Sequence, residues 1–101
     1  MFEARKFRVL EIIIQNRKAG FDAMRVALMS GLPEMSWEEI KSFVILLSTE
    51  GYVKIISGDN DIQYIAVQPT AIARLYSARE TAKTENVKKI FDGILKLVSL
   101  V

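Results

Sequence analysis

The chain has 101 residues, of which 50% are hydrophobic and 26% charged, a composition typical of one globular domain. Cysteine and histidine are both absent, which excludes disulfides, zinc sites built on thiolate or imidazole, and nucleophilic pairs that need histidine. A formal net charge of +2 does not by itself require a nucleic acid or an anionic membrane as partner. No apolar run approaches the roughly 20 residues of a membrane span, and no signal-peptide pattern opens the sequence. We therefore expect a cytoplasmic, non-enzymatic protein with no catalytic residue, no metal site and no cofactor.

Two helices are predicted in the first third of the chain. Residues 2–19 carry Val9, Leu10 and Ile13 at helical spacing, and Gly20 follows as a stop signal. Asp22 is the predicted N-cap of a second, short helix, which Phe21 and Val26 would close as a hydrophobic staple. This helix is expected to end near Ser30, with Gly31 in the left-handed conformation that follows many helices.

A third helix has the clearest local signal. Ser36-Trp37-Glu38-Glu39 has the pattern of a capping box, in which Ser36 and Glu39 satisfy each other's backbone N–H groups. The helix places Ile40, Phe43, Val44 and Leu47 on one face and is predicted to end at Gly51.

A β-hairpin and a fourth helix are predicted next. Residues 52–57 and 62–67 are rich in β-branched and aromatic residues, and Gly58-Asp59-Asn60-Asp61 between them favours a hairpin turn over a calcium loop. Pro69 precedes a predicted helix at 70–79 with Ile72, Leu75 and Tyr76 facing inward, and a polar connector is expected at 77–85.

The last segment, residues 86–101, is predicted to be a helix whose wide apolar arc needs a partner on more than one side. One possibility is that it folds back onto the first helix, whose Ile12 and Ile14 also need cover. Another is that it packs against a second copy of the chain, and a third is that it lies on a membrane surface. We predict a homodimer, with residues 1–79 as the main domain and residues 80–101 as connector and dimerisation helix. The predicted dimer interface consists of Val87, Ile90, Phe91, Ile94, Leu95 and Val98.

The order of the predicted elements, ααα-β-β-α-α, resembles a winged-helix domain across residues 5–76. The most specific stretch is Leu46-Leu47-Ser48-Thr49-Glu50-Gly51-Tyr52-Val53, which is similar to the passage from a recognition helix into the first wing strand. Val67-Gln68-Pro69-Thr70-Ala71 is similar to the Leu-Thr-x-x-Gly that often follows the second wing strand, with Ala71 in place of glycine. The whole chain resembles, more loosely, the small YjcQ-type winged-helix proteins of bacteria and prophages. The resemblance implies an α+β, mostly α, winged helix-turn-helix fold with a two-stranded wing and an added C-terminal helix.

The same resemblance implies a small bacterial or phage transcription regulator, in which the third helix enters the major groove of double-stranded DNA and the wing touches phosphate. The distribution of charge argues against DNA binding by the third helix and the wing. Residues 36–68 hold two basic and five acidic residues, whereas each end of the chain carries a net charge of +3. The alternative function is therefore a protein-assembly module, whose acidic third helix and wing dock a basic protein partner. Trp37 could anchor such a partner or pack within its own turn. The predicted DNA-contacting residues are Arg5, Arg8, Arg17, Lys18, Trp37, Lys41, Ser42 and Ile45.

Overall fold

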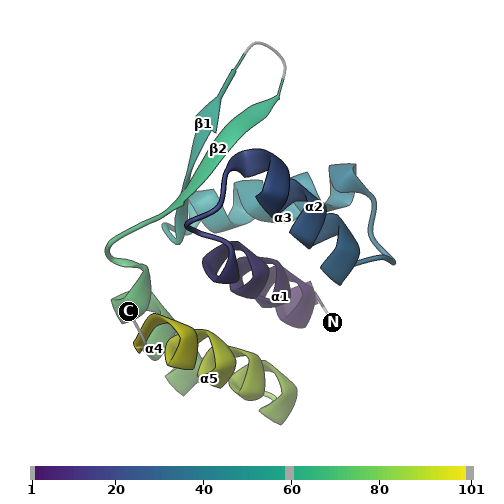
Figure 1. Ribbon diagram of the computed structural model, residues 1–101. Coiled ribbons are helices and arrows are strands. Elements are labelled where there is room, and N and C mark those ends of the chain that lie inside the picture. The colour runs from purple at the N-terminus through teal and green to yellow at the C-terminus, as the bar shows by residue number, and fades with distance from the viewer. Residues whose placement is uncertain (1, 59–60, 100–101) are drawn as a thin grey trace.

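The described part of the chain folds into helices and one antiparallel hairpin, which confirms the α+β class (Figure 1). The computed structural model describes residues 2–58 and 61–99, with the side chains of all of these except residues 2, 3, 72, 98 and 99. The elements in chain order are α1 (Phe2–Gln15), α2 (Phe21–Gly31), α3 (Trp37–Thr49), β1 (Val53–Ser57), β2 (Ile62–Val67), α4 (Ala71–Thr81) and α5 (Glu85–Ser99). None of the described helices is long and apolar enough to cross a membrane.

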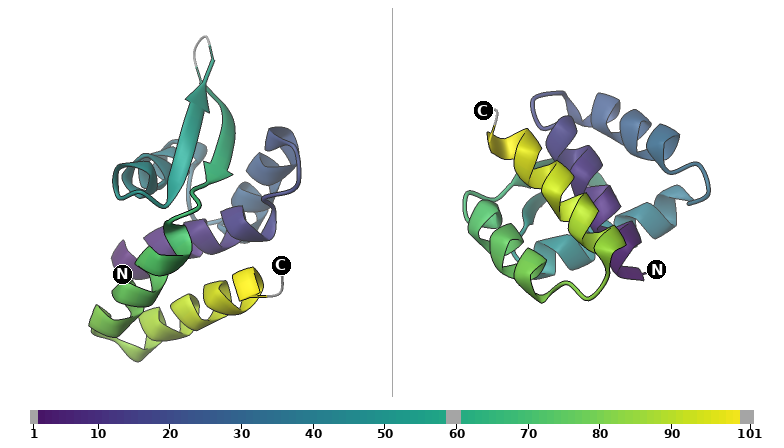
Figure 2. Two further views of the ribbon diagram at one scale, coloured as in Figure 1. Left: turned by 90° about the vertical axis from the view of Figure 1, so that its left-hand side faces the viewer. Right: turned by 90° about the horizontal axis from the view of Figure 1, so that it is seen from below.

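Helix α1 lies at the centre of the core, between α2 and α3 on one side and α5 on the other (Figure 2). Its predicted stripe of Val9, Leu10 and Ile13 is completely buried. Ile12 and Ile14, which lie outside that stripe, are also at most 3% exposed. The apolar arc of α1 is therefore wider than the predicted stripe, and neighbours on two sides of the helix cover it.

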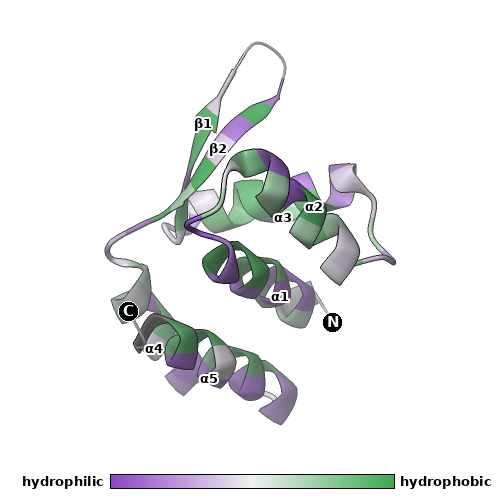
Figure 3. Ribbon diagram, in the orientation of Figure 1, coloured by the Kyte–Doolittle hydropathy of each residue, from purple (hydrophilic) through white to green (hydrophobic). Residues whose placement is uncertain are grey.

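Helix α5 folds back onto α1 and also packs on α4, which is the first of the three predicted arrangements (Figure 2). Its apolar residues face α1, and its polar residues face outward (Figure 3). Phe91, Ile94 and Leu95 belong to the same hydrophobic core as α1, so the core continues across residue 79.

This burial corrects the predicted dimer interface. Phe91, Ile94 and Leu95 are 1%, 0% and 8% exposed within one chain, so they are not available to a second copy in this structure. The physical reason is that α1 presents apolar surface to α5 within the same chain, where no association entropy is lost. Val87 and Ile90 are only partly buried, and the side chain of Val98 lies outside the described residues. Dimerisation itself stays a prediction.

Both ends of α3 have the predicted structure. The Ser36 hydroxyl accepts the Glu39 N–H at 3.2 Å, and a Glu39 carboxylate oxygen accepts the Ser36 N–H at 3.2 Å, which completes the capping box. At the other end Gly51 has a φ of 89°, and the Tyr52 N–H donates to the Leu47 carbonyl at 2.9 Å. This is a Schellman motif, and it directs the chain from α3 into β1.

Helix α2 ends within one residue of the predicted Ser30, but its predicted N-cap, its staple and the predicted conformation of Gly31 are wrong. The N-cap is Gly20 rather than Asp22, because the Gly20 carbonyl already accepts the first helical bond, from Met24 at 3.1 Å. Val26 is 63% exposed and closes no staple. Gly31 is the last helical residue and has no positive φ, and its lack of a side chain serves packing, since a Cβ there would lie 2.8 Å from Ile12 Cδ1.

The hairpin projects from the helices (Figure 1) and has an irregular register between Ile56 and Ser57. At the turn, the Gly58 N–H donates a hydrogen bond to the Asp61 carbonyl at 2.8 Å, which connects the chain on the two sides of the turn. The predicted turn residues Asp59 and Asn60 lie outside the described residues.

The predicted polar connector at 77–85 is mostly helical, because α4 continues to Thr81 and α5 begins at Glu85. Leu75 is buried as predicted, whereas Tyr76 is 55% exposed because α4 packs mainly on α5 and has one covered face. The side chain of Ile72 lies outside the described residues.

Candidate interaction surface of α3 and the hairpin

A groove of about 370 Å³ lies between α3 and the hairpin, and we refer to it as the α3–hairpin groove. Its lining combines carboxylates, hydroxyls and apolar side chains with one lysine. The lining residues are Glu38, Lys41, Ser42, Ile45, Ser57, Gly58, Asp61 and Ile62.

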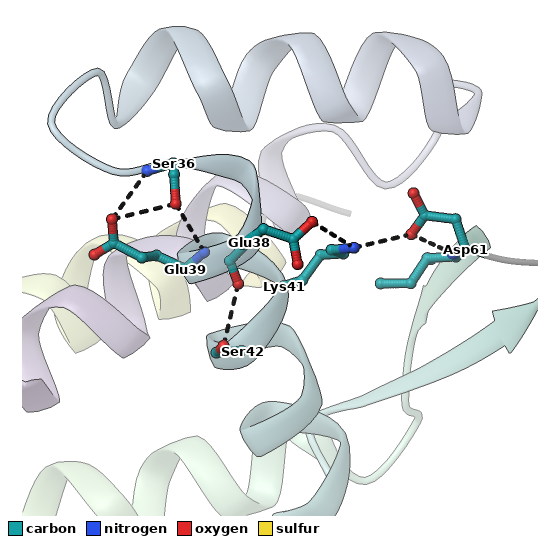
Figure 4. A network of polar contacts seen from close by, with 7 residues as sticks. Ser36, Glu38, Glu39, Lys41, Ser42 and Asp61 are labelled. Atoms are coloured by element: carbon teal, nitrogen blue, oxygen red, sulfur yellow. Dashed lines mark hydrogen bonds and ion pairs between the residues drawn. The ribbon is translucent and has the colours of Figure 1, made fainter.

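Lys41 joins the two walls of the groove through ion pairs (Figure 4). Its Nζ atom lies 3.1 Å from Glu38 Oε1 on α3 and 3.6 Å from Asp61 Oδ1 on the hairpin. The hydrogen bond with Glu38 is the main reason that the pKa of Lys41 is raised. The Ile62 N–H donates to Asp61 Oδ1 at 2.8 Å and is the main reason that the pKa of Asp61 is lowered. Lys41 and Asp61 are therefore both charged at neutral pH.

The exposed part of α3 is apolar and acidic. Ile45 is 57% exposed and Leu46 is 36% exposed, although both belong to a helix whose opposite face is core. The Ser42 hydroxyl donates to the Glu38 carbonyl of its own helix at 3.1 Å (Figure 4). Glu38 remains open to solvent, with 81% of its side chain exposed.

Trp37 lies within its own turn and contributes little exposed surface. It is 9% exposed, its ring is 6.1 Å from that of Phe21, and the guanidinium carbon of Arg25 lies 4.8 Å from the ring centroid. Its indole N–H helps to hold down the pKa of Asp61 but makes no hydrogen bond of normal geometry. Of the two predicted roles, packing within the turn is confirmed.

The four basic residues predicted near the N-terminus do not form one patch. Arg5 and Arg8 lie near the start of α1, whereas Arg17 and Lys18 follow its last residue, Gln15, so the length of the helix separates the two pairs. Arg8 forms an ion pair with Glu11, and Arg17 donates to the Ile14 carbonyl at 2.7 Å. Arg5 and Lys18 are exposed.

The two basic ends of the chain do meet, because α1 and α5 are neighbours. At least four of their eleven basic residues are paired with carboxylates within the chain, through Lys6–Glu50, Arg8–Glu11, Arg79–Asp92 and Lys88–Glu85. A phosphate ion that approached this side would compete with carboxylates already in place.

Sequence reasoning missed the buried Lys6. The side chain of Lys6 is only 5% exposed, and its Nζ lies 2.9 Å from Glu50 Oε1. One signal was present, because Lys6 is four residues before Leu10 and therefore shares the buried face of the first helix. Its partner, 44 positions away, could not be inferred from that spacing.

Among the described residues, no group of three or more His, Cys, Asp and Glu could hold a metal ion. Comparison with protein-family models, with curated proteins and with solved structures finds no match for this chain.

Proposed function

We propose that this chain is a winged-helix-like protein-interaction module, and that the α3–hairpin groove binds a basic, amphipathic segment of a protein partner. One observation carries the proposal. Lys41, the single basic residue of α3, is held between Glu38 and Asp61, while Ile45 is 57% exposed along the same groove. The groove therefore offers carboxylates beside apolar surface, which suits a partner that has Arg or Lys next to aliphatic residues.

The alternative is DNA binding by α3 as in a transcription regulator, which is what the winged-helix resemblance implies. The charge of the groove argues against it, because affinity for DNA comes largely from basic side chains that neutralise phosphates. Lys41 would have to leave two carboxylates in order to contact a phosphate, and Glu38 and Asp61 would repel that phosphate.

The two functions are separated by titrating ¹⁵N-labelled protein with two probes. One is a synthetic helical peptide that alternates Arg pairs with Leu, and the other is a nonspecific DNA duplex at low and moderate salt. We expect the peptide to shift the amide signals of α3 and β2, and we expect the duplex to cause no shift there. A scrambled peptide of the same composition is the control for charge alone.

Two variants locate the binding site. Ile45→Ser is expected to weaken the peptide at least threefold, whereas Ile56→Ser should have no effect, because Ile56 is 46% exposed on β1 but lies outside the groove. Glu38→Lys should also weaken the peptide. A duplex that binds in a salt-dependent way and gains affinity from Glu38→Lys, together with a peptide that shifts no groove signal, would reverse the assignment in favour of DNA.

A further inference from the structure

A second cavity, of about 480 Å³, lies on another side of the molecule, where α4 turns into α5 above the first half of α1. We refer to it as the corner cavity. Its volume is within the range of about 300–1,000 Å³ that small-molecule sites occupy. We propose that the corner cavity binds a small carboxylate whose apolar part is about the size of one aromatic ring.

The floor of the cavity is a preformed aromatic cluster. The ring centroid of Phe7 lies 4.3 Å from that of Phe91 and 5.6 Å from that of Tyr52, and the second pair is edge to face. All three residues are at most 6% exposed, so the core already fixes their positions. A ligand that rests on them gains apolar contact without the cost of ordering these side chains.

The charges around the cavity favour an anion over a cation. The Lys6–Glu50 ion pair lies in one wall, where Lys6 Nζ donates to Glu50 Oε2 at 3.0 Å, and Lys83 lies at the rim. The Lys6 ammonium group is already paired with a carboxylate within the wall, and the Lys83 ammonium group adds a positive charge at the rim.

The rim also offers a hydrogen-bond donor. The Thr84 oxygen accepts the Val87 N–H at 3.2 Å, so the hydroxyl hydrogen points away from that bond and can be donated. We therefore place the carboxylate of the ligand at the rim, beside Thr84 and Lys83.

Three compounds with the same apolar body test the assignment: 4-phenylbutyrate, 4-phenylbutanol and 4-phenylbutylamine. Each is titrated into ¹⁵N-labelled full-length protein, and the dissociation constant is taken from the shifts of amides around the corner cavity. We expect 4-phenylbutyrate to bind about tenfold more tightly than the amine, with the alcohol between them. If none of the three shifts these amides at millimolar concentration, there is no such site, and equal affinity for all three would refute the anion preference.

Surface variants keep the test independent of folding. Lys83→Ala should weaken 4-phenylbutyrate about threefold to fivefold and leave 4-phenylbutanol unchanged. Lys89→Ala is the matched control, since Lys89 is an exposed lysine of α5 that does not line the cavity. Ala78→Phe should fill the cavity and abolish the binding of all three compounds, and its melting temperature is measured as the control for folding because Ala78 is partly buried against the core. Equal losses for Lys83→Ala and Lys89→Ala would contradict the proposed position of the carboxylate.

Discussion

Replacement of Phe91 by alanine tests whether α5 belongs to the core of a single chain. Phe91 is 1% exposed, and its ring centroid lies 4.3 Å from that of Phe7 on α1. Removal of a fully buried phenylalanine side chain costs about 3–5 kcal/mol. Because Phe91 borders the corner cavity, water can enter the space that the side chain leaves. We therefore expect the free energy of unfolding to fall by about 3 kcal/mol. That is a large part of the roughly 5–15 kcal/mol by which a domain of this kind is stable.

The assay is urea unfolding followed by circular dichroism at two protein concentrations that differ about fiftyfold. If α5 is part of the core of one chain, the urea midpoint falls in Phe91→Ala and does not depend on protein concentration in either protein. Lys89→Ala, an exposed change on the same helix, should stay within about 0.5 kcal/mol of the parent. A parental midpoint that rises with concentration, and a variant that loses this rise, would show that Phe91 stabilises a dimer and would refute the reasoning.

Three further predictions concern stability. Gly51→Ala should lower the free energy of unfolding by about 1–2 kcal/mol in urea titrations, because φ is 89° and the new Cβ would lie 2.8 Å from Arg74 Nε; no loss would mean that the turn relaxes. Ser36→Ala should cost about 1 kcal/mol in the same assay through loss of the capping box, and a neutral result would show that water replaces the cap. The hydrogen bond from Arg79 is the main reason that the pKa of Asp92 lies below its ordinary value of 3.8. The Arg79–Asp92 ion pair therefore stabilises the fold fully above that pH, and this contribution is lost as the pH falls through the lowered pKa of Asp92. Because Asp92→Asn lacks the ionisable group, its acid unfolding should be less steep. An unchanged acid profile would show that the ion pair does not contribute.

The local signals of α3 were sufficient to predict both of its ends. Ser36 and Glu39 are three residues apart and complete each other's hydrogen bonds, and Gly51 supplies a positive φ that few other residues adopt. These interactions involve only near neighbours in the chain, so the pattern of residue types predicts them. The start of α2 was mispredicted, because Asp22 is a good capping residue but lies inside a helix that begins at Phe21 with Gly20 as its N-cap.

The predicted functional residues had a mixed outcome because side-chain partners are set by the fold. Lys41 and Ile45 do lie on one surface, as the helical spacing of the sequence indicates. The ion pair of Lys41 with Asp61 joins residues that are 20 positions apart, and only the docking of the hairpin on α3 brings them together. Trp37 was expected to anchor a partner or to pack within its own domain, and it packs within the domain because Phe21 and Arg25 of α2 cover its ring.

The sequence alone determined the α+β class, the order of helices and strands, the ends of α3 and the acidic character of the segment from Ser36 to Gln68. These properties depend on spacing, on conformational preference and on the number of charges, all of which are local. The tertiary structure decided that α5 covers α1, that Lys6 is buried and paired with Glu50, and that Lys41 is held between two carboxylates. An apolar face can be buried against several different partners, and the partner that forms depends on the packing of the whole fold. The spacing of residues along the chain does not indicate which partner this is.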